Sequence, residues 1–329
     1  MLLYGILGLI VVGASWCLIG IVLGRAPKEG IDARIVQLCS GFVSVAASLA
    51  LAAFFLPPAP CPHRALFAVC ATYFLGGAFD CVGMLAMSAG MQRGPNGIVW
   101  AIMQSAPVFP FIVGILFFNV APSPPRLLGL AAILAALCCF AASKDNSGGA
   151  GRGWRFFALL ALAVIAVQQN LTALPSYYDE ARQISPVVRT MSTSLGSLTV
   201  VVVNIAFGLA RDYGGTSRIF AAFLKPRLWL YVLGIQFFSL IFSYTLFYPG
   251  IDILAKAGAG AVSYPLMVGS CIVSFTLYAM LVLKEKASRI QIAALALCLL
   301  GLACLCFQAP PTNRPSPVRD AIHQILFGR

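Results

Sequence analysis

Long apolar stretches recur along the chain, and we count ten of them. Each has about the 20 residues that a helix needs to cross the hydrocarbon core of a bilayer. The runs are continuous, whereas the strands of a membrane barrel would alternate polar and apolar residues, so we expect helices. The stretches cover residues 2–24, 33–56, 64–88, 95–119, 126–143, 155–175, 187–210, 228–249, 259–283 and 289–307. The predicted fold class is therefore an all-α integral membrane protein with ten transmembrane helices.

The composition excludes a water-soluble globule. Of the 329 residues, 60% are hydrophobic and 10% are charged, whereas about 25% are charged in an ordinary soluble protein. We interpret the first stretch as a membrane helix rather than an export signal, because no basic residue precedes it and no small-residue cleavage site ends it. We therefore expect a multi-pass protein of the cell (inner) membrane, in contact with membrane lipid.

Basic residues predict the orientation of the helices. A net charge of +12 would suggest a nucleic-acid partner for a soluble protein, but here the 22 Lys and Arg residues are spread over short loops. The loops on one predicted face hold 14 of them and the other face holds 8. Because cytoplasmic loops carry the excess of basic residues, we expect both termini outside the cytoplasm and no nucleic-acid partner.

The cysteines predict neither a disulfide framework nor a metal site. Ten of the 11 lie in the apolar stretches, no CxxC pair occurs, and both histidines lie outside the predicted spans. Cysteine inside a helix bundle behaves mostly as a small hydrophobe. We expect no metal and no cofactor. The glycine-rich loop at residues 144–155 lacks the form of a phosphate-binding loop, so nothing indicates an ATP-driven pump.

The two halves of the chain resemble each other. A polar linker at residues 144–154 separates repeat 1 (1–143) from repeat 2 (155–307), and a polar tail, which we expect to be mobile, covers 308–329. A shift of 163 residues sets RGPNGIV over KAGAGAV and PRLLGLAAIL over SRIQIAALAL. Five helices per repeat is an odd number, so the repeats must insert with opposite orientation. This inverted plan is typical of secondary transporters.

One segment resembles a known family. Residues 258–302, GAGAVSYPLMVGSCIVSFTLYAMLVLKEKASRIQIAALALCLLGL, combine a glycine-rich start, the pair Glu285 and Lys286 at a helix end, and Gln291 before a helix of small residues. This pattern is similar to the closing motif of the drug/metabolite transporter superfamily, in its ten-helix EamA-like and rhamnose-symporter-like branch. The resemblance implies transport without naming a solute, since members carry sugars, amino acids, nucleotide sugars or cationic drugs. One departure is that Pro122 stands in the first repeat where Glu285 stands in the second.

A single carboxylate, Asp80, stands within the apolar run FLGGAFDCVGMLAM. An ionised aspartate in mid-membrane costs about 2.5–3.5 kcal/mol unless it is neutral, paired or wetted. Tyr73, Gly77, Asp80 and Met84 share one helical face, which should point inward. Asp80 could bind a proton or cation that couples transport. Alternatively, it accepts hydrogen bonds or lies in a wet vestibule without such a role.

Other polar or aromatic side chains within the spans could line the same cavity. Amides suit a neutral hydroxyl-rich or zwitterionic solute, and aromatic rings could stack on a sugar or an aromatic ring. The alternative is that these groups only join helices, at about 0.6 kcal/mol per hydrogen bond. Besides Asp80 and Tyr73, the candidates are Trp16, Trp100, Gln104, Gln168, Gln169, Asn170, Asn204, Gln236, Tyr244 and Tyr264. Pro107, Pro110 and Pro265 predict irregular helices nearby.

We therefore expect a secondary active transporter of a small organic solute, working by alternating access and coupled to protons or another cation. An intramembrane transferase is the principal alternative. Such an enzyme would need paired acids or a His/Asp set, and no two acids share a helical face within a predicted span. A structural or sensory membrane protein is the third possibility. We expect no enzymatic activity, and the sequence leaves the solute and the oligomeric state open.

Overall fold

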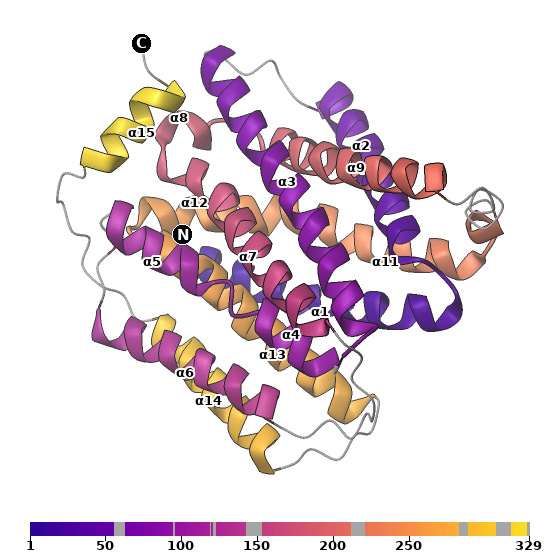
Figure 1. The fold of residues 1–329 in the computed structure, drawn as a ribbon. Coiled ribbons are helices and arrows are strands. Elements are labelled where there is room, and N and C mark those ends of the chain that lie inside the picture. Colours follow the sequence, from indigo (N-terminus) through magenta and orange to yellow (C-terminus); the bar gives the residue numbers. More distant parts are fainter. Residues whose placement is uncertain are drawn as a thin grey trace.

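The computed structural model describes residues 1–55, 63–94, 96–118, 120, 123–142, 153–211, 221–282, 289–306 and 317–327. Over these ranges the chain is helical and contains no β-strand (Figure 1). The prediction of an all-α fold is confirmed for them. The pair Glu285 and Lys286 lies outside the described residues, as does the predicted linker except for Gly153 and Trp154.

Six of the described helical segments are long and apolar enough to cross a membrane. The sixth of them is α11, which continues through a π-helical turn, η3, into α12 without a break. These segments support a multi-pass membrane protein. They are α1 (Leu2–Arg25), α2 (Ala33–Phe55), α3 (His63–Met91), α7 (Trp154–Ala173), α9 (Pro186–Arg211) and α11 (Pro226–Phe242) with η3 (Ser243–Phe247) and α12 (Tyr248–Lys256).

Four further apolar helices are shorter. They are α5 (Val108–Phe118), α6 (Pro124–Ala142), α13 (Ser263–Leu281) and α14 (Arg289–Leu305). A one-turn 3₁₀ helix, η4 (Gly260–Val262), leads into α13. Short connectors complete the described fold: η1 (Ala26–Glu29) between α1 and α2, and η2 (Leu174–Tyr177) with α8 (Asp179–Arg182) between α7 and α9.

Two of the predicted helix boundaries are wrong. The stretch 95–119 forms two helices, α4 (Asn96–Met103) and α5, with a turn between them. Pro107 has no backbone N–H to continue a helix, and Ser105 and Ala106 instead donate to the carbonyls three residues before them. The stretch 228–249 is longer than predicted, because the helical path continues to Lys256.

Part of the C-terminal tail, which we expected to be mobile, is helical in the structure. Its last described part is a helix, α15 (Pro317–Phe327), which packs against α3 and α5 and lies beside α8 in Figure 1. Ile322 contacts the main hydrophobic core, and the ring of His323 lies 3.1 Å from a carboxylate oxygen of Glu180. These tertiary contacts hold a segment whose sequence alone looked like a polar tail.

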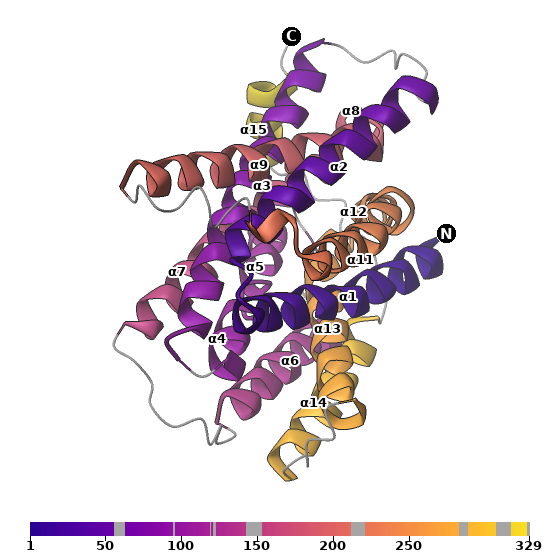
Figure 2. The same cartoon turned by 90° about the vertical axis from the view of Figure 1, so that its right-hand side faces the viewer.

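The helices pack in a small number of extensive pairs (Figures 1 and 2). α3 lies against both α7 and α9, α1 against α13, and α6 against α14, while α2 contacts α9 and α11. α4 and α5 each contact α7. Most of these pairs join a helix from before residue 144 to one from after it. The core is therefore shared between the two halves of the chain.

Glycines permit the closest of these crossings. A Cβ atom on Gly77 of α3 would lie 1.8 Å from the backbone oxygen of Thr193 on α9, and one on Gly196 would lie 1.9 Å from the backbone oxygen of Phe74. The backbones of α3 and α9 therefore touch directly, as small residues permit in membrane helix pairs. This contact fixes α3, which carries Asp80, against α9.

Candidate functional site

A cavity of about 230 Å³ lies at the centre of the helical bundle. Its walls come from both halves of the chain, namely from α1, α2, α3 and α4 and from α7, α9 and the α11–η3–α12 segment. Amide and hydroxyl groups dominate its polar lining, and Trp16, Trp100, Phe247 and Tyr248 add aromatic rings. Among the described residues that line it, Asp80 is the only acid and there is no Lys, Arg or His.

Asp80 faces this cavity from α3, one turn before Met84, which lines it too. The inward-facing side of α3 thus agrees with the helical periodicity seen in the sequence. Within the described part of the chain, no hydrogen bond or ion pair reaches the Asp80 carboxylate. The carboxylate is therefore available to a proton, a cation or a solute that enters the cavity.

Six more of the candidate residues line the cavity. They are Trp16, Trp100, Gln104, Gln168, Gln169 and Gln236. The indole of Trp100 stacks on Phe275 with ring centroids 6.0 Å apart, and the amide of Gln168 donates to the hydroxyl of Thr172 at 3.2 Å. The Gln104 side chain is buried and its amide lies 3.7 Å from the sulfur of Cys271. Trp100 and Gln104 therefore contact α13, whereas Gln168 contacts its own helix.

The other five candidates lie outside this cavity. Asn170 donates to the carbonyl of Ala166 at 2.8 Å and faces a second, apolar hollow between α5, α7 and α15. Asn204 is exposed on the outer side of α9, and the hydroxyl of Tyr244 lies 2.9 Å from that of Ser48. Tyr73 and Tyr264 are fully buried in the main core cluster.

Hydroxyl groups of α2 and α9 are the cavity residues that our sequence analysis missed. On α9, Thr190, Thr193, Ser194 and Ser197 line the cavity, and the hydroxyl of Ser194 lies 2.6 Å from that of Ser44 on α2. Their spacing of i, i+3, i+4 and i+7 marks one face of a helix. That pattern was readable in the sequence and would have identified this wall.

A buried ion pair, also missed, lies beside the cavity. One guanidinium nitrogen of Arg189, on the first turn of α9, donates to both carboxylate oxygens of Asp252 on α12, at 2.9 and 3.0 Å. Its other nitrogens donate to the carbonyls of Ile184 at 3.0 Å and Ala181 at 2.7 Å. The Arg189 side chain has no exposed surface, although the sequence analysis counted all Lys and Arg residues as loop residues.

Ionic contacts also lie at the connectors outside the spans. Near η1, the pKa of Asp32 is lowered: its partial burial opposes ionisation, but hydrogen bonds and charge from Arg34 outweigh that burial. In α8, the pKa of Glu180 is lowered by a hydrogen bond from its own backbone N–H, to which the contact with His323 adds. Tyr231 of α11 donates to Glu29 at 2.8 Å, which joins η1 to the second half of the chain.

Comparisons with known proteins give information about the fold of this chain and not about its function. No family model matches the chain, and no curated protein matches it in sequence. Solved structures do share its fold. One is a crystal structure that aligns with a TM-score of 0.61 over 91% of this chain and 96% of its own, at 14% sequence identity. The helical arrangement therefore occurs elsewhere in an experimentally determined protein.

Proposed function

We propose that this protein is a secondary active transporter of a small organic solute, working by alternating access and coupled to protons through Asp80. The observation that carries the proposal is the cavity that both halves of the chain enclose, in which one carboxylate has no partner among the described residues. An uncompensated acid within membrane spans is expensive and is usually functional. We place the protein in the drug/metabolite transporter superfamily on the sequence resemblance described above.

Helix positions support two repeats of five spans each. When α5 and α6 are shifted by 163 residues, their described ranges fall on α13 and α14. The same shift relates Asp80 to Ser243, and both of these residues line the cavity. The four shorter apolar helices, added to the six long segments, would supply ten spans.

The packing also supports an inverted relation between the repeats. If the two halves are exchanged, α1 corresponds to α7 and α13 to α4 with α5, so the α1–α13 contact predicts contacts of α7 with α4 and α5. In the same way α3 corresponds to α11 and α9 to α2, so the α3–α9 contact predicts a contact of α11 with α2. Each of these predicted pairs is in contact. The α6–α14 and α2–α9 pairs would map onto themselves, as expected for helices that meet at a twofold axis. Inverted repeats of this kind enclose the substrate site of many secondary transporters.

The chemistry of the lining favours a neutral or positively charged solute. Amides and hydroxyls both donate and accept hydrogen bonds, and the tryptophan rings offer flat apolar faces to a sugar or an organic cation. The Asp80 carboxylate would repel an anion, and no basic residue among the described lining residues offsets this repulsion. A sugar, an amino acid, a related metabolite or a cationic drug remains compatible with this lining.

The proposal is tested with purified protein in sealed vesicles. A thermal-shift screen of sugars, amino acids, nucleotides and lipophilic cations first identifies a solute, because a bound solute stabilises the folded state by mass action. Uptake of that solute is then measured with and without a pH gradient. We expect Asp80→Asn to abolish the dependence on the gradient, whereas Asp32→Asn, which changes an exposed acid outside the cavity, keeps it. Full gradient-dependent uptake by Asp80→Asn would refute the coupling role, and wild-type protein that moves none of these solutes would refute transport.

A further inference from the structure

The cavity ends at a buried polar layer near α8 and α12. Thr190 and Tyr248 line the cavity, while Arg189, directly before Thr190 on α9, lies behind them with no exposed side-chain surface. Tyr73 and Tyr264 are buried in the same region, at 0% and 1% exposure. A solute in the cavity therefore has no path through this layer in the present conformation.

The layer is built from both halves of the chain. The guanidinium group of Arg189 lies 6.0 Å from the ring centroid of Tyr73 on α3 and 5.7 Å from that of Tyr248 on α12. The two rings meet edge to face with centroids 5.2 Å apart. Asp252 neutralises the cation from the other side and keeps 17% of its side chain exposed. Movement of α12 away from α3 and α9 would therefore separate the pair and uncover a buried charge.

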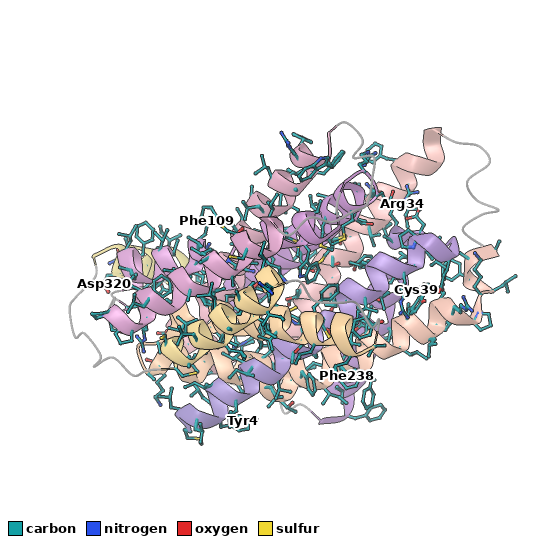
Figure 3. All side chains as sticks on the ribbon, turned by 90° about the horizontal axis from the view of Figure 1, so that it is seen from below. Tyr4, Arg34, Cys39, Phe109, Phe238 and Asp320 are labelled. Carbon is teal, nitrogen blue, oxygen red and sulfur yellow. The ribbon has the colours of Figure 1, made fainter. Side chains whose placement is uncertain are left out.

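The residue of the first repeat that corresponds to Arg189 is an exposed arginine, Arg34. Arg34, at the start of α2, stands 155 residues before Arg189, at the start of α9, and the same shift relates Gly41 to Gly196. This shift is smaller than the 163 residues that relate the later helices, because the connection between α9 and α11 is longer than that between α2 and α3. Among the described residues, Arg34 pairs with Asp32 alone, two residues away, and its side chain is 44% exposed. Figure 3 shows Arg34 on the opposite side of the molecule from Asp320 of α15, the helix that lies beside α8.

We propose that the Arg189–Asp252 pair is a latch that holds the cavity closed at the α8–α12 end. This inference rests on the proposed transport function, because alternating access requires one end to close while the other opens. The two related arginines then differ because one belongs to the closed end and the other does not. In the opposite conformation the latch separates, Arg189 becomes hydrated, and η1 with the start of α2 becomes more tightly packed.

Removal of one latch partner should shift the conformational equilibrium. Asp252→Asn leaves Arg189 as an uncompensated buried cation in the closed state, whereas the open state hydrates it. A minor conformation commonly makes up about 0.1–10% of a protein at equilibrium. If the open state becomes dominant, amide hydrogen exchange in η2, α8 and α12 should rise by roughly tenfold or more. Exchange in η1 and the first turn of α2 should fall at the same time.

The experiment is hydrogen-exchange mass spectrometry on the full-length protein in lipid nanodiscs. Asp252→Glu keeps the charge and should give nearly the wild-type pattern. Asp32→Asn serves as the matched control, because it removes an acid from the exposed pair at the other end and Asn can still cap α2. If Asp252→Asn does not fold, the double variant Arg189→Gln with Asp252→Asn removes the pair without leaving a buried charge, and it should shift exchange in the same directions.

The reciprocal pattern decides the inference. Faster exchange at α8 and α12 without slower exchange at η1 would indicate local fraying and overturn the latch, as would an unchanged pattern. This readout needs no identified solute. Failure of wild-type protein to move any solute in vesicles would therefore refute the proposed function separately from the exchange result.

Discussion

The contact between α3 and α9 provides a quantitative test of the fold. In Gly77→Ala the new methyl group would lie 1.8 Å from the backbone oxygen of Thr193, and 2.6 and 2.9 Å from its backbone carbon and Cα. Carbon contacts are optimal near 3.5–4.0 Å, so the two helices must separate by roughly 1.5 Å. Because the obstructing atoms are backbone, no change of rotamer can relieve the overlap. Overpacking of this kind costs about 3 kcal/mol.

This cost should appear as a lower thermal stability of the detergent-solubilised protein. For a chain of this size, 3 kcal/mol corresponds to a fall in Tm of roughly 5–10 °C. The control is Gly234→Ala in α11, where an added methyl group meets nothing within 4 Å. That variant should be neutral or more stable by up to about 1 kcal/mol, since alanine favours a helix. A Gly77→Ala protein with the same Tm as wild type would show that α3 and α9 do not cross as described.

Two further predictions concern contacts near the ends and the centre of the bundle. The pKa of Glu180 is lowered mainly by its own backbone N–H and further by the contact with His323, so the share of the stabilisation that acts on α15 is present above about pH 4.5 and is lost as the pH falls through the folded pKa. A mobility-reporting label attached near Gln324 should therefore become more mobile when the pH falls below that value. Glu180→Gln or His323→Ala should weaken this response. Mobility of the label that does not change with pH in the wild-type protein would contradict the prediction. At the cavity wall, a double-mutant cycle of Ser44→Ala and Ser194→Ala should give a coupling of about 0.5–1 kcal/mol in unfolding experiments, and additive effects would exclude the hydrogen bond.

The sequence predicted the helices and part of the cavity because both depend on local patterns. Continuous apolar runs of the right length formed helices, and the spacing of Tyr73, Gly77, Asp80 and Met84 identified a face of α3 that points inward. Asn204 and Tyr244, in contrast, were chosen by residue type alone. In the structure Asn204 is exposed on the outer surface, and the hydroxyl of Tyr244 hydrogen-bonds to that of Ser48 on α2.

The latch residues escaped the sequence analysis for physical reasons. Asp252 lies beyond the end of the predicted span 228–249. In the structure, however, α11 continues through the π-helical turn η3 into α12, which contains Pro249 in its first turn and also contains Asp252. Arg189 resembled an ordinary basic residue flanking a span. Only its tertiary contacts, with Asp252 of α12 and with the carbonyl of Ala181 in α8, show that it is buried.

The contrast between the two membrane acids leads to a last prediction. Asp252 has an arginine partner, while Asp80 has none among the described residues. An unpaired carboxylate within a span costs about 2.5–3.5 kcal/mol on insertion scales, although water in the cavity reduces this penalty. If Asp80 is retained for transport, Asp80→Asn should raise the Tm of the purified protein, by up to roughly 5 °C for about 2 kcal/mol, while it impairs coupled uptake. If Asp80 instead supports the fold through hydrogen bonds, the same substitution should lower the Tm. Thermal unfolding of this one variant therefore separates a functional acid from a structural one without knowledge of the solute.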